Sequence, residues 1–369
     1  MALGLFQKGQ YALDIGGSSV VVVGLAGRAG NLKLHTCFEW PLPAGLVVDG
    51  EISDADLFGR ELKAMVGQRK LRGKAVYLAV SNQKVIVRNI DMPDMTEDEL
   101  MGAIQFQAQE YIPIPVEEVV LDSQVTGKRV GPDGSTRQEV LLVAAQKTMI
   151  TSLLAAVRQA GLKVAGIDVS SLALVRALLP EGSFFSEAGE AGATRGIADI
   201  SSSVSTLVVA VDGLMKFTRI VNFSSDRFAR SLTEAKGIPF EDAQVMVQRI
   251  GLPGPLPPDE EFYPDEIVKE TQIALGKVAV ELAEEIRRSF DYYQGQEHAT
   301  PVSELVLSGR GALLRNLDSH LSSTLSLPVV IGNPLIHVAQ NASGQPDAYL
   351  AAMAPCLAVA IGLALPGDN

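Results

Sequence analysis

Two strand–turn–strand units, each with an aspartate near the end of its first strand, constrain this sequence more than any other feature. The first consists of the apolar stretch 11–15, containing Asp14, a Gly-Gly-Ser-Ser turn and the valine-rich segment 20–25. The second begins at 197–200 with Asp199, turns through three serines and continues in another apolar stretch. Apolar runs on both sides of a Gly- or Ser-rich turn predict hairpins. The same unit therefore opens each half of the chain.

A third buried-looking strand, 304–307, runs into the loop 308–311 and opens a helix. Glycines let a backbone approach an anion closely, and turn N–H groups form anion-binding nests. Two such turns facing each other predict a cleft for a polyphosphate, with the third loop closing over adenosine and both aspartates holding waters around Mg²⁺. The predicted nucleotide-binding residues are Asp14, Gly16, Gly17, Ser18, Ser19, Asp199, Ser201, Ser202, Ser203, Ser308, Gly309 and Gly311, with Asp14 and Asp199 also serving the metal through water.

A simpler interpretation stays open for each piece. Aspartate side chains often stabilise their own turn by hydrogen-bonding to nearby backbone groups, and Asp14 and Asp199 are explained equally by this role. The serines of the second turn are explained by a polar turn, because no His and Asp stand at a recognisable triad spacing. We therefore predict no catalytic nucleophile.

The composition of the chain argues against several classes of function. The formal net charge of −12 argues against general nucleic-acid binding and against direct docking on anionic lipid. Two distant cysteines and four scattered histidines predict neither a disulfide framework nor a multi-histidine metal site. The N-terminal stretch lacks the pattern of a signal peptide, and the longest apolar runs, 20–26 and 356–365, are shorter than the ~20 residues that span a bilayer. A soluble cytoplasmic protein is expected.

The chain divides near its middle. The stretch 180–196 is rich in Gly, Ala, Ser and Glu, as in a linker. Before it, a module of the order strand–helix–strand–strand–helix occupies about 76–160, where Thr96 and Glu99 have capping-box spacing. After it, 265–294 has the length and periodicity of one long helix.

The order of these features resembles the actin-like ATPase superfamily. Within it, the chain is similar to the PilM family of type IV pilus assembly proteins, a branch that resembles the division protein FtsA. The motifs that carry this resemblance run from about residue 11 to 365 and are Tyr11–Ser19, Met92–Leu100, Gln109–Pro115, Glu285–Tyr293, Leu307–Gly309 and Ala354–Leu365.

The resemblance implies an α/β, actin-like (ribonuclease H-like) fold of two lobes with FtsA-type subdomains. Subdomain 1A would comprise 1–75 and 161–190, with 1C inserted as 76–160. Subdomain 2A would comprise 191–222 and 299–369, with 2B inserted as 223–298.

The resemblance also implies partners. The family binds the short cytoplasmic N-terminal peptide of the inner-membrane protein PilN between 1A and 1C, and connects through PilN to PilO and PilP; contacts with the pilus motor ATPases are also attributed to it. The segments that would flank this groove place Ile86, Arg88, Ile104 and Phe106 among the peptide contacts. The chain is then expected in the cytoplasm, peripheral to the inner membrane through PilN, in a machine of the kind that drives twitching motility.

Five positions depart from the actin-like pattern. Val21 stands where a phosphate-binding Lys is usual, Ser201 and Arg310 stand where Gly is usual, and Gln244 and Val247 replace the Glu and Lys directed at the ribose. Losing one charge-assisted phosphate contact costs on the order of 1.5–3 kcal/mol. We therefore expect a scaffold that binds ATP and Mg²⁺ weakly, without efficient hydrolysis. The alternative is an active ATPase in which Arg310 or Lys216 supplies the missing charge. A third, an FtsA-like filament former, is disfavoured because the chain ends Leu-Pro-Gly-Asp-Asn rather than in an amphipathic helix.

Overall fold

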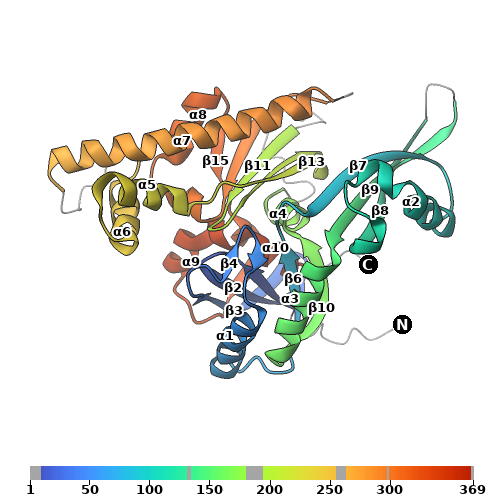
Figure 1. Cartoon of the computed structure of the whole chain (residues 1–369), viewed down its shortest axis with the longest axis horizontal. Coiled ribbons are helices and arrows are strands. Elements are labelled where there is room, and N and C mark those ends of the chain that lie inside the picture. The colour runs from blue at the N-terminus through green and yellow to red at the C-terminus, as the bar shows by residue number, and fades with distance from the viewer. Residues whose placement is uncertain (1–9, 131–133, 180–193, 255–262, 297–298, 367–369) are drawn as a thin grey trace.

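The computed structural model describes residues 10–130, 134–179, 194–254, 263–296 and 299–366. Most of the predicted linker 180–196 therefore lies outside the described residues. The described part contains four sheets, one of them only two-stranded, and each half of the chain begins with one of the predicted hairpins (Figure 1).

The first hairpin forms the centre of a six-stranded sheet with the order β10-β6-β1-β2-β3-β16. Strand β1 pairs antiparallel with β2 and parallel with β6, so Asp14 reaches the edge of the sheet where parallel strands end. The strands are β1 (Gln10–Ile15), β2 (Ser19–Arg28), β3 (Asn31–Pro41), β6 (Ala75–Val80), β10 (Lys163–Val169) and β16 (Val338–Asn341).

The second hairpin forms the centre of a five-stranded sheet with the order β13-β12-β11-β14-β15. Strand β11 pairs antiparallel with β12 and parallel with β14, which repeats the arrangement of β1 between β2 and β6. The strands are β11 (Thr194–Ile200), β12 (Ser205–Val211), β13 (Leu214–Val221), β14 (Glu304–Ser308) and β15 (Val329–Ile331).

Helices α4 (Ser170–Leu178) and α10 (Ala358–Ala364) lie between the two large sheets and share one apolar core with both. They approach very closely, since a Cβ added at Gly362 would lie 1.9 Å from the carbonyl oxygen of Ala173. Only glycine permits this contact. It follows that the two lobes are joined through a tightly packed helix pair.

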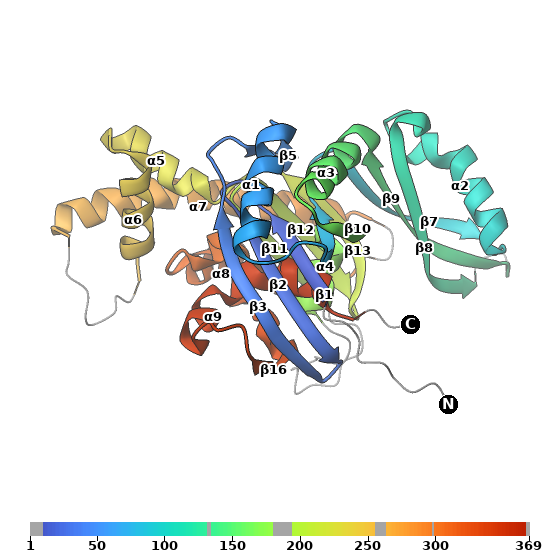
Figure 2. The same ribbon diagram turned by 90° about the horizontal axis from the view of Figure 1, so that it is seen from below.

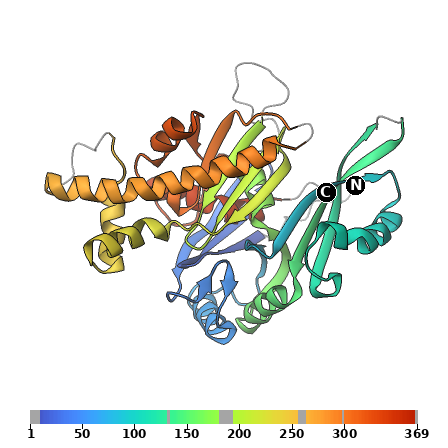
Figure 3. The same ribbon diagram turned by 45° about the horizontal axis from the view of Figure 1, so that its top comes forward.

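The outer face of each sheet carries its own helices. Helices α1 (Ala55–Gln68) and α3 (Lys147–Gln159) cover the six-stranded sheet (Figure 2). Helix α7 (Asp265–Gln294) crosses the five-stranded sheet together with α5 (Asp226–Lys236) and α8 (Leu317–Leu325) (Figure 3). The remaining short elements are β4 (Val47–Val48), β5 (Glu51–Ile52), α6 (Phe240–Ile250), α9 (Asp347–Met353) and the 3₁₀ turns η1 (Val116–Glu118), η2 (Arg310–Leu313), η3 (Pro334–His337) and η4 (Ala354–Leu357).

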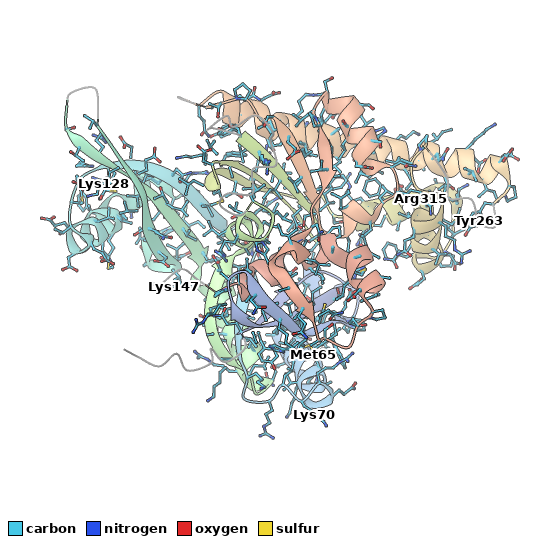
Figure 4. All side chains as sticks on the ribbon, turned by 180° about the vertical axis from the view of Figure 1, so that it is seen from behind. Met65, Lys70, Lys128, Lys147, Tyr263 and Arg315 are labelled. Atoms are coloured by element: carbon cyan, nitrogen blue, oxygen red, sulfur yellow. The ribbon has the colours of Figure 1, made fainter. Side chains whose placement is uncertain are left out.

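A separate three-stranded sheet, β7-β9-β8, stands beside the lobes with helix α2 (Glu97–Tyr111) on one face. Its strands are β7 (Val85–Pro93), β8 (Val119–Val130) and β9 (Thr136–Gln146). In Figure 4, Lys128 marks the projecting end of this sheet and Lys147 its base. The expected insertion 76–160 also included β6 and α3, but both pack with the first sheet because β6 pairs with β1 and α3 shares the core of α1.

Among the described residues, one helical stretch, Asp347–Ala364, has the length and apolar composition to cross a membrane. It consists of α9, η4 and α10, and 67% of it is buried inside the protein. Its apolar character is accounted for by the core between the two sheets.

Candidate functional site

The two predicted hairpin turns have the same pattern of backbone hydrogen bonds. The amide of Gly16 donates to the carbonyl of Ser19 at 2.9 Å, and the amide of Ser201 donates to the carbonyl of Val204 at 3.2 Å. In the first hairpin Asp14 is paired across the strands with Val21, and in the second Asp199 is paired with Thr206. The sequence repeat is thus also a structural repeat, with one aspartate in each lobe.

The two turns touch each other. The amide of Ser18 donates to Ser202 Oγ at 3.2 Å. A Cβ added at Gly16 would lie 3.1 Å from Ser202 Oγ, and one at Gly17 would lie 3.1 Å from Ser203 Cβ. The absence of side chains in the first turn therefore lets it pack directly against the second.

The third predicted loop packs on the end of β11. Gly309 has φ +75°, and a Cβ there would lie 2.6 Å from the carbonyl oxygen of Ile200, so glycine is required on both grounds. Ser308 donates through Oγ to the carbonyl of Pro355 at 2.9 Å, and it lies beside Asp199 in the parallel pairing of β11 and β14. All three loops therefore converge where the two lobes meet.

Arg310 ties the third loop to the first lobe. Its guanidinium forms an ion pair with Glu39 on β3 and lies 3.4 Å from Ser19 Oγ. Both side chains of the pair are partly buried. Lys216, the other cation predicted to replace the missing phosphate contact, forms a 2.7 Å ion pair with Glu139. Each of these cations is thus engaged by a carboxylate.

The loops enclose what we name the cleft cavity, a space of about 180 Å³ whose walls include Asp14, Gly16, Asp199, Ser201 and Ser203. This volume is smaller than the ~300–1,000 Å³ of ordinary ligand pockets. The other predicted nucleotide residues, Gly17, Ser18, Ser19, Ser202, Ser308, Gly309 and Gly311, do not line this cavity. A nucleotide would therefore enter only if the two turns moved apart.

The two aspartates strongly affect the electrostatics of the cleft cavity. Burial, and next the neighbouring Asp199, raise the pKa of Asp14 to about 7. Burial raises the pKa of Asp199 to about 6, partly offset by the hydroxyl of Ser308. Carboxylates that resist ionisation together are stabilised by a shared proton or by a cation. Carboxylate oxygens are ligands that Mg²⁺ prefers, so the two aspartates fit the predicted water-mediated metal contact. Among the described residues there is no group of three or more His, Cys, Asp or Glu that could hold a metal ion directly.

The region predicted to receive adenosine holds a small cavity of about 80 Å³ between α5, α6 and η2. Gln244, Val247, Arg310 and Gly311 all line it. Three of the five residues that depart from the actin-like pattern, Gln244, Val247 and Arg310, thus gather at one place, although they come from distant parts of the chain.

Sequence reasoning missed six polar residues of the cleft cavity, namely Glu51, Ser81, Thr148, Ser152, Ser170 and Thr206. Ser81 and Ser170 follow the ends of β6 and β10, and the hydroxyl of Ser81 lies 2.9 Å from that of Thr206 in the other lobe. A signal was present, because the carboxyl ends of parallel strands meet at one edge of a sheet and gather ligand-binding residues there.

The four predicted peptide contacts do not form one surface. Ile86 and Arg88 line a cavity between β7 and the second lobe. Ile104 is 4% exposed in the core between α2 and its sheet, whereas Phe106 is 88% exposed. Ile104 and Phe106 are two residues apart on a helix whose inward face includes Leu100 and Ile104, which leaves Phe106 turned outward. The peptide contacts themselves stay a prediction.

Comparison with solved structures identifies the class. The structure of EutJ from Carboxydothermus hydrogenoformans matches with a TM-score of 0.53 at 13% identity, covering 100% of this chain and 93% of that one. MreB5 of Spiroplasma citri bound to ADP matches with a TM-score of 0.55 at 12% identity, covering 96% of this chain and 95% of that one. These matches define an actin-like fold.

The sequence narrows the class to one family. The sequence profile described as type IV pilus assembly protein PilM matches residues 12–367, and the chain belongs to that family. The solved structure of a PilM-PilN type IV pilus biogenesis complex matches with a TM-score of 0.80 at 26% identity, covering 96% of this chain and 97% of that one. The family and the fold expected from the sequence motifs are both confirmed.

Proposed function

We propose that this chain is a scaffold of the type IV pilus assembly machine that binds the cytoplasmic N-terminal segment of PilN. The observation that carries the proposal is the match along 96% of the chain to a PilM-PilN complex, at a TM-score of 0.80. That match includes nearly the whole chain, which supports a comparable binding site in this protein. In this proposal PilN keeps the protein at the cytoplasmic face of the inner membrane, and contacts with PilO, PilP and the pilus motors follow from that position.

The subdomain plan belongs to the same proposal. The six-stranded sheet with α1 and α3 corresponds to 1A, and the β7-β9-β8 sheet with α2 corresponds to 1C. The five-stranded sheet corresponds to 2A, and α5, α6 and α7 correspond to 2B. The partner segment then lies beside β7, where Ile86 and Arg88 border a cavity that also reaches the second lobe.

The nucleotide cleft supports weak ATP binding rather than turnover. Its turns are in contact through Ser18 and Ser202, and Val21 offers no cation opposite Asp14. If ATP binds, the two turns would face its phosphates while Asp14 and Asp199 would hold waters around Mg²⁺, which would supply positive charge to the phosphate oxygens. The Arg310–Glu39 ion pair must then break or shift, which lowers the net affinity.

The test is calorimetric titration of the full chain with a synthetic peptide of the cognate PilN N-terminus, with and without ATP and Mg²⁺. Binding in both conditions supports a scaffold, and no binding in either refutes the proposed partner. The second candidate, an active ATPase, is favoured by the paired aspartates. Steady phosphate release that disappears in Asp14→Ala would establish it in place of the weak-binding proposal.

A further inference from the structure

The outer face of helix α2 carries apolar side chains that the described residues leave uncovered. Phe106 is 88% exposed, the highest value among the large apolar side chains of the described residues, and Met101 is 55% exposed. The helix lies on the side of the three-stranded sheet that faces away from the two lobes (Figures 1 and 2). Within the described part of the chain, neither lobe therefore covers this face.

The exposed residues of α2 form one continuous stripe without charge. At about 3.6 residues per turn, they fall on the side of the helix opposite Leu100 and Ile104, which are buried in the core beneath it. We name this surface the α2 stripe; it consists of Met101, Gly102, Gln105, Phe106 and Gln109. A strip of uncharged side chains along one helix is a surface against which a second helix can pack.

Gly102 keeps the middle of the α2 stripe open. A Cβ at this position would meet nothing within 4 Å, and the residue does not have a positive φ, so no contact or turn within the described residues requires glycine. Glycine is unfavourable in the interior of a helix, but it lets another backbone approach closely. Phe106 lies one turn further along the same side. The open position and the exposed ring are therefore neighbours.

Acidic residues surround the α2 stripe. The stretch 89–127 contains nine Asp or Glu residues and no Lys, Arg or His, in a chain whose net charge is −12. Asp98 stands near the start of the stripe and Glu110 at its end, and neither forms an ion pair with a described residue. Charges at the rim of an interface steer a partner of opposite charge toward it.

We propose that the α2 stripe binds an amphipathic helix of another protein, with apolar side chains along one face and Lys or Arg beside that face. The apolar face packs over Gly102 and against the ring of Phe106, and the basic side chains lie near Asp98 and Glu110. Amphipathic helices that dock through apolar anchors are a recurrent mode of peptide recognition. This surface is separate from the cavity beside β7, so the proposal goes beyond the proposed function and does not depend on it.

The acidic surroundings select this occupant over others. Carboxylates repel anionic lipid headgroups and the phosphates of nucleic acid. A second copy of the chain would bring the same net charge of −12 to the contact. A basic segment of a different protein is the occupant whose charge complements the surroundings of the stripe.

The test is a calorimetric titration of the full chain with a synthetic helical peptide of about 18 residues, with Leu along one face and Lys on both flanks. A peptide of the same composition in scrambled order, which lacks the apolar face, is the control. We expect the amphipathic peptide to bind about tenfold or more tightly than the scrambled one. The affinity should fall between ~50 mM and ~300 mM NaCl, because salt screens the attraction.

Phe106→Ala tests the apolar anchor. Because the ring is exposed, the variant should keep the fold, and we expect it to weaken binding of the amphipathic peptide about tenfold or more. Tyr292→Ala, which removes another exposed ring from a helix of the second lobe, is the matched control. It should leave the affinity unchanged.

Gly102→Gln separates binding from stability. Glutamine is a better helix former than glycine, so the variant should unfold at a higher urea concentration than the wild type. Its side chain also fills the open position, and we expect it to weaken peptide binding by roughly 3- to 10-fold. Gly67→Gln in α1, where an added Cβ also meets nothing within 4 Å, should show the gain in stability without the loss of affinity.

A pair of double variants tests the charges. Asp98→Asn with Glu110→Gln should weaken binding at low salt and have little effect at high salt, because it removes charges next to the stripe. Glu241→Gln with Asp242→Asn makes the same change in net charge at the start of α6. This control should leave the affinity nearly unchanged at both salt concentrations.

Several results would overturn the proposal. Equal affinity for the amphipathic and scrambled peptides would mean that net charge alone attracts them. Unchanged affinity in Phe106→Ala would place the contact elsewhere. Self-association of the full chain that disappears in Phe106→Ala, measured by analytical ultracentrifugation, would make a second copy the occupant. A saturating PilN peptide should not compete with the amphipathic peptide, and competition would show that the two surfaces are one.

Discussion

The backbone amide of Ser18, in the turn after β1, donates to the hydroxyl of Ser202, in the turn after β11, across 184 residues of sequence. This bond joins the two copies of the repeated hairpin and brings the lobes together at their turns. Glycines that would let a backbone approach a phosphate here let one turn approach the other. The structure therefore describes a closed cleft, and the predictions below concern what holds it closed.

The packing of the two turns predicts that side chains in the first turn are destabilising. Gly17→Ala would place a Cβ 3.1 Å from Ser203 Cβ and 3.2 Å from the Ser202 carbonyl oxygen. We expect a loss of about 1–3 kcal/mol, as for other overpacked sites, read from urea midpoints. Gly276→Ala in α7 is the control, since nothing lies within 4 Å of the added Cβ, and it should gain roughly 0.5–1 kcal/mol. Equal changes in the free energy of unfolding for Gly17→Ala and Gly276→Ala would contradict the close packing of the two turns.

The ion pair between Arg310 and Glu39 predicts coupled stability effects. Arg310→Ala and Glu39→Gln should each lower the free energy of unfolding, and the double variant should lose less than the sum. The expected coupling is about 0.5–3 kcal/mol, the range for residues in contact. Hydrogen exchange of the 16–19 turn should also speed up in each single variant. If the losses in the two single variants add up to the loss in the double variant, the ion pair does not contribute to holding the two lobes together.

The raised pKa values of Asp14 and Asp199 predict that the cleft is less stable at higher pH. Folding raises both pKa values, to about 7 and about 6, above the unfolded value of 3.8. The native state therefore binds more protons than the unfolded state between about pH 4 and 7, so their contribution to stability falls as pH rises through that window. Asp14→Asn should stabilise the protein at pH 8 and lose that advantage at pH 4, as thermal melts would show. The reverse trend would mean that a cation neutralises the pair.

The position of Val21 predicts how ATP affinity can be restored. Val21 lies directly across the hairpin from Asp14, so a lysine there reaches the same edge of the sheet. Val21→Lys should tighten ATP–Mg²⁺ binding by roughly 10- to 100-fold, the value of one charge-assisted contact. Val21→Met, which changes size without charge, should leave the affinity as it is. An unchanged affinity in Val21→Lys, with the fold intact, would mean that another feature limits binding.

The orientation of α2 predicts opposite outcomes for two neighbours. Ile104→Ala leaves a cavity in the core beneath α2 and should cost about 2–5 kcal/mol. Phe106→Ala removes an exposed ring and should change stability by less than ~0.5 kcal/mol. Because Phe106 lies outside the cavity that Ile86 and Arg88 border, its loss should also leave PilN-peptide affinity unchanged. A strong loss of peptide binding in Phe106→Ala would move the partner site to the outer face of α2.

The sequence by itself determined the repeated unit. A strand ending in Asp, a Gly- or Ser-rich turn and a second apolar strand are local patterns, and both hairpins form with the expected pairing of Asp14 and Asp199 to the following strand. The family motifs along the chain determined the actin-like fold in the same way, because each is a contiguous block of residues.

Only the tertiary structure decided how closely the two repeated units approach and which residues meet between them. Ser18 and Ser202, Arg310 and Glu39, and Ser81 and Thr206 are pairs from different lobes. The assignment of β6 and α3 to the first sheet, and of Ile104 to a core rather than a groove, likewise depends on how elements pack. The physical reason is that hairpins form from neighbours in sequence, whereas the closure of a cleft balances contacts between residues that no local pattern relates.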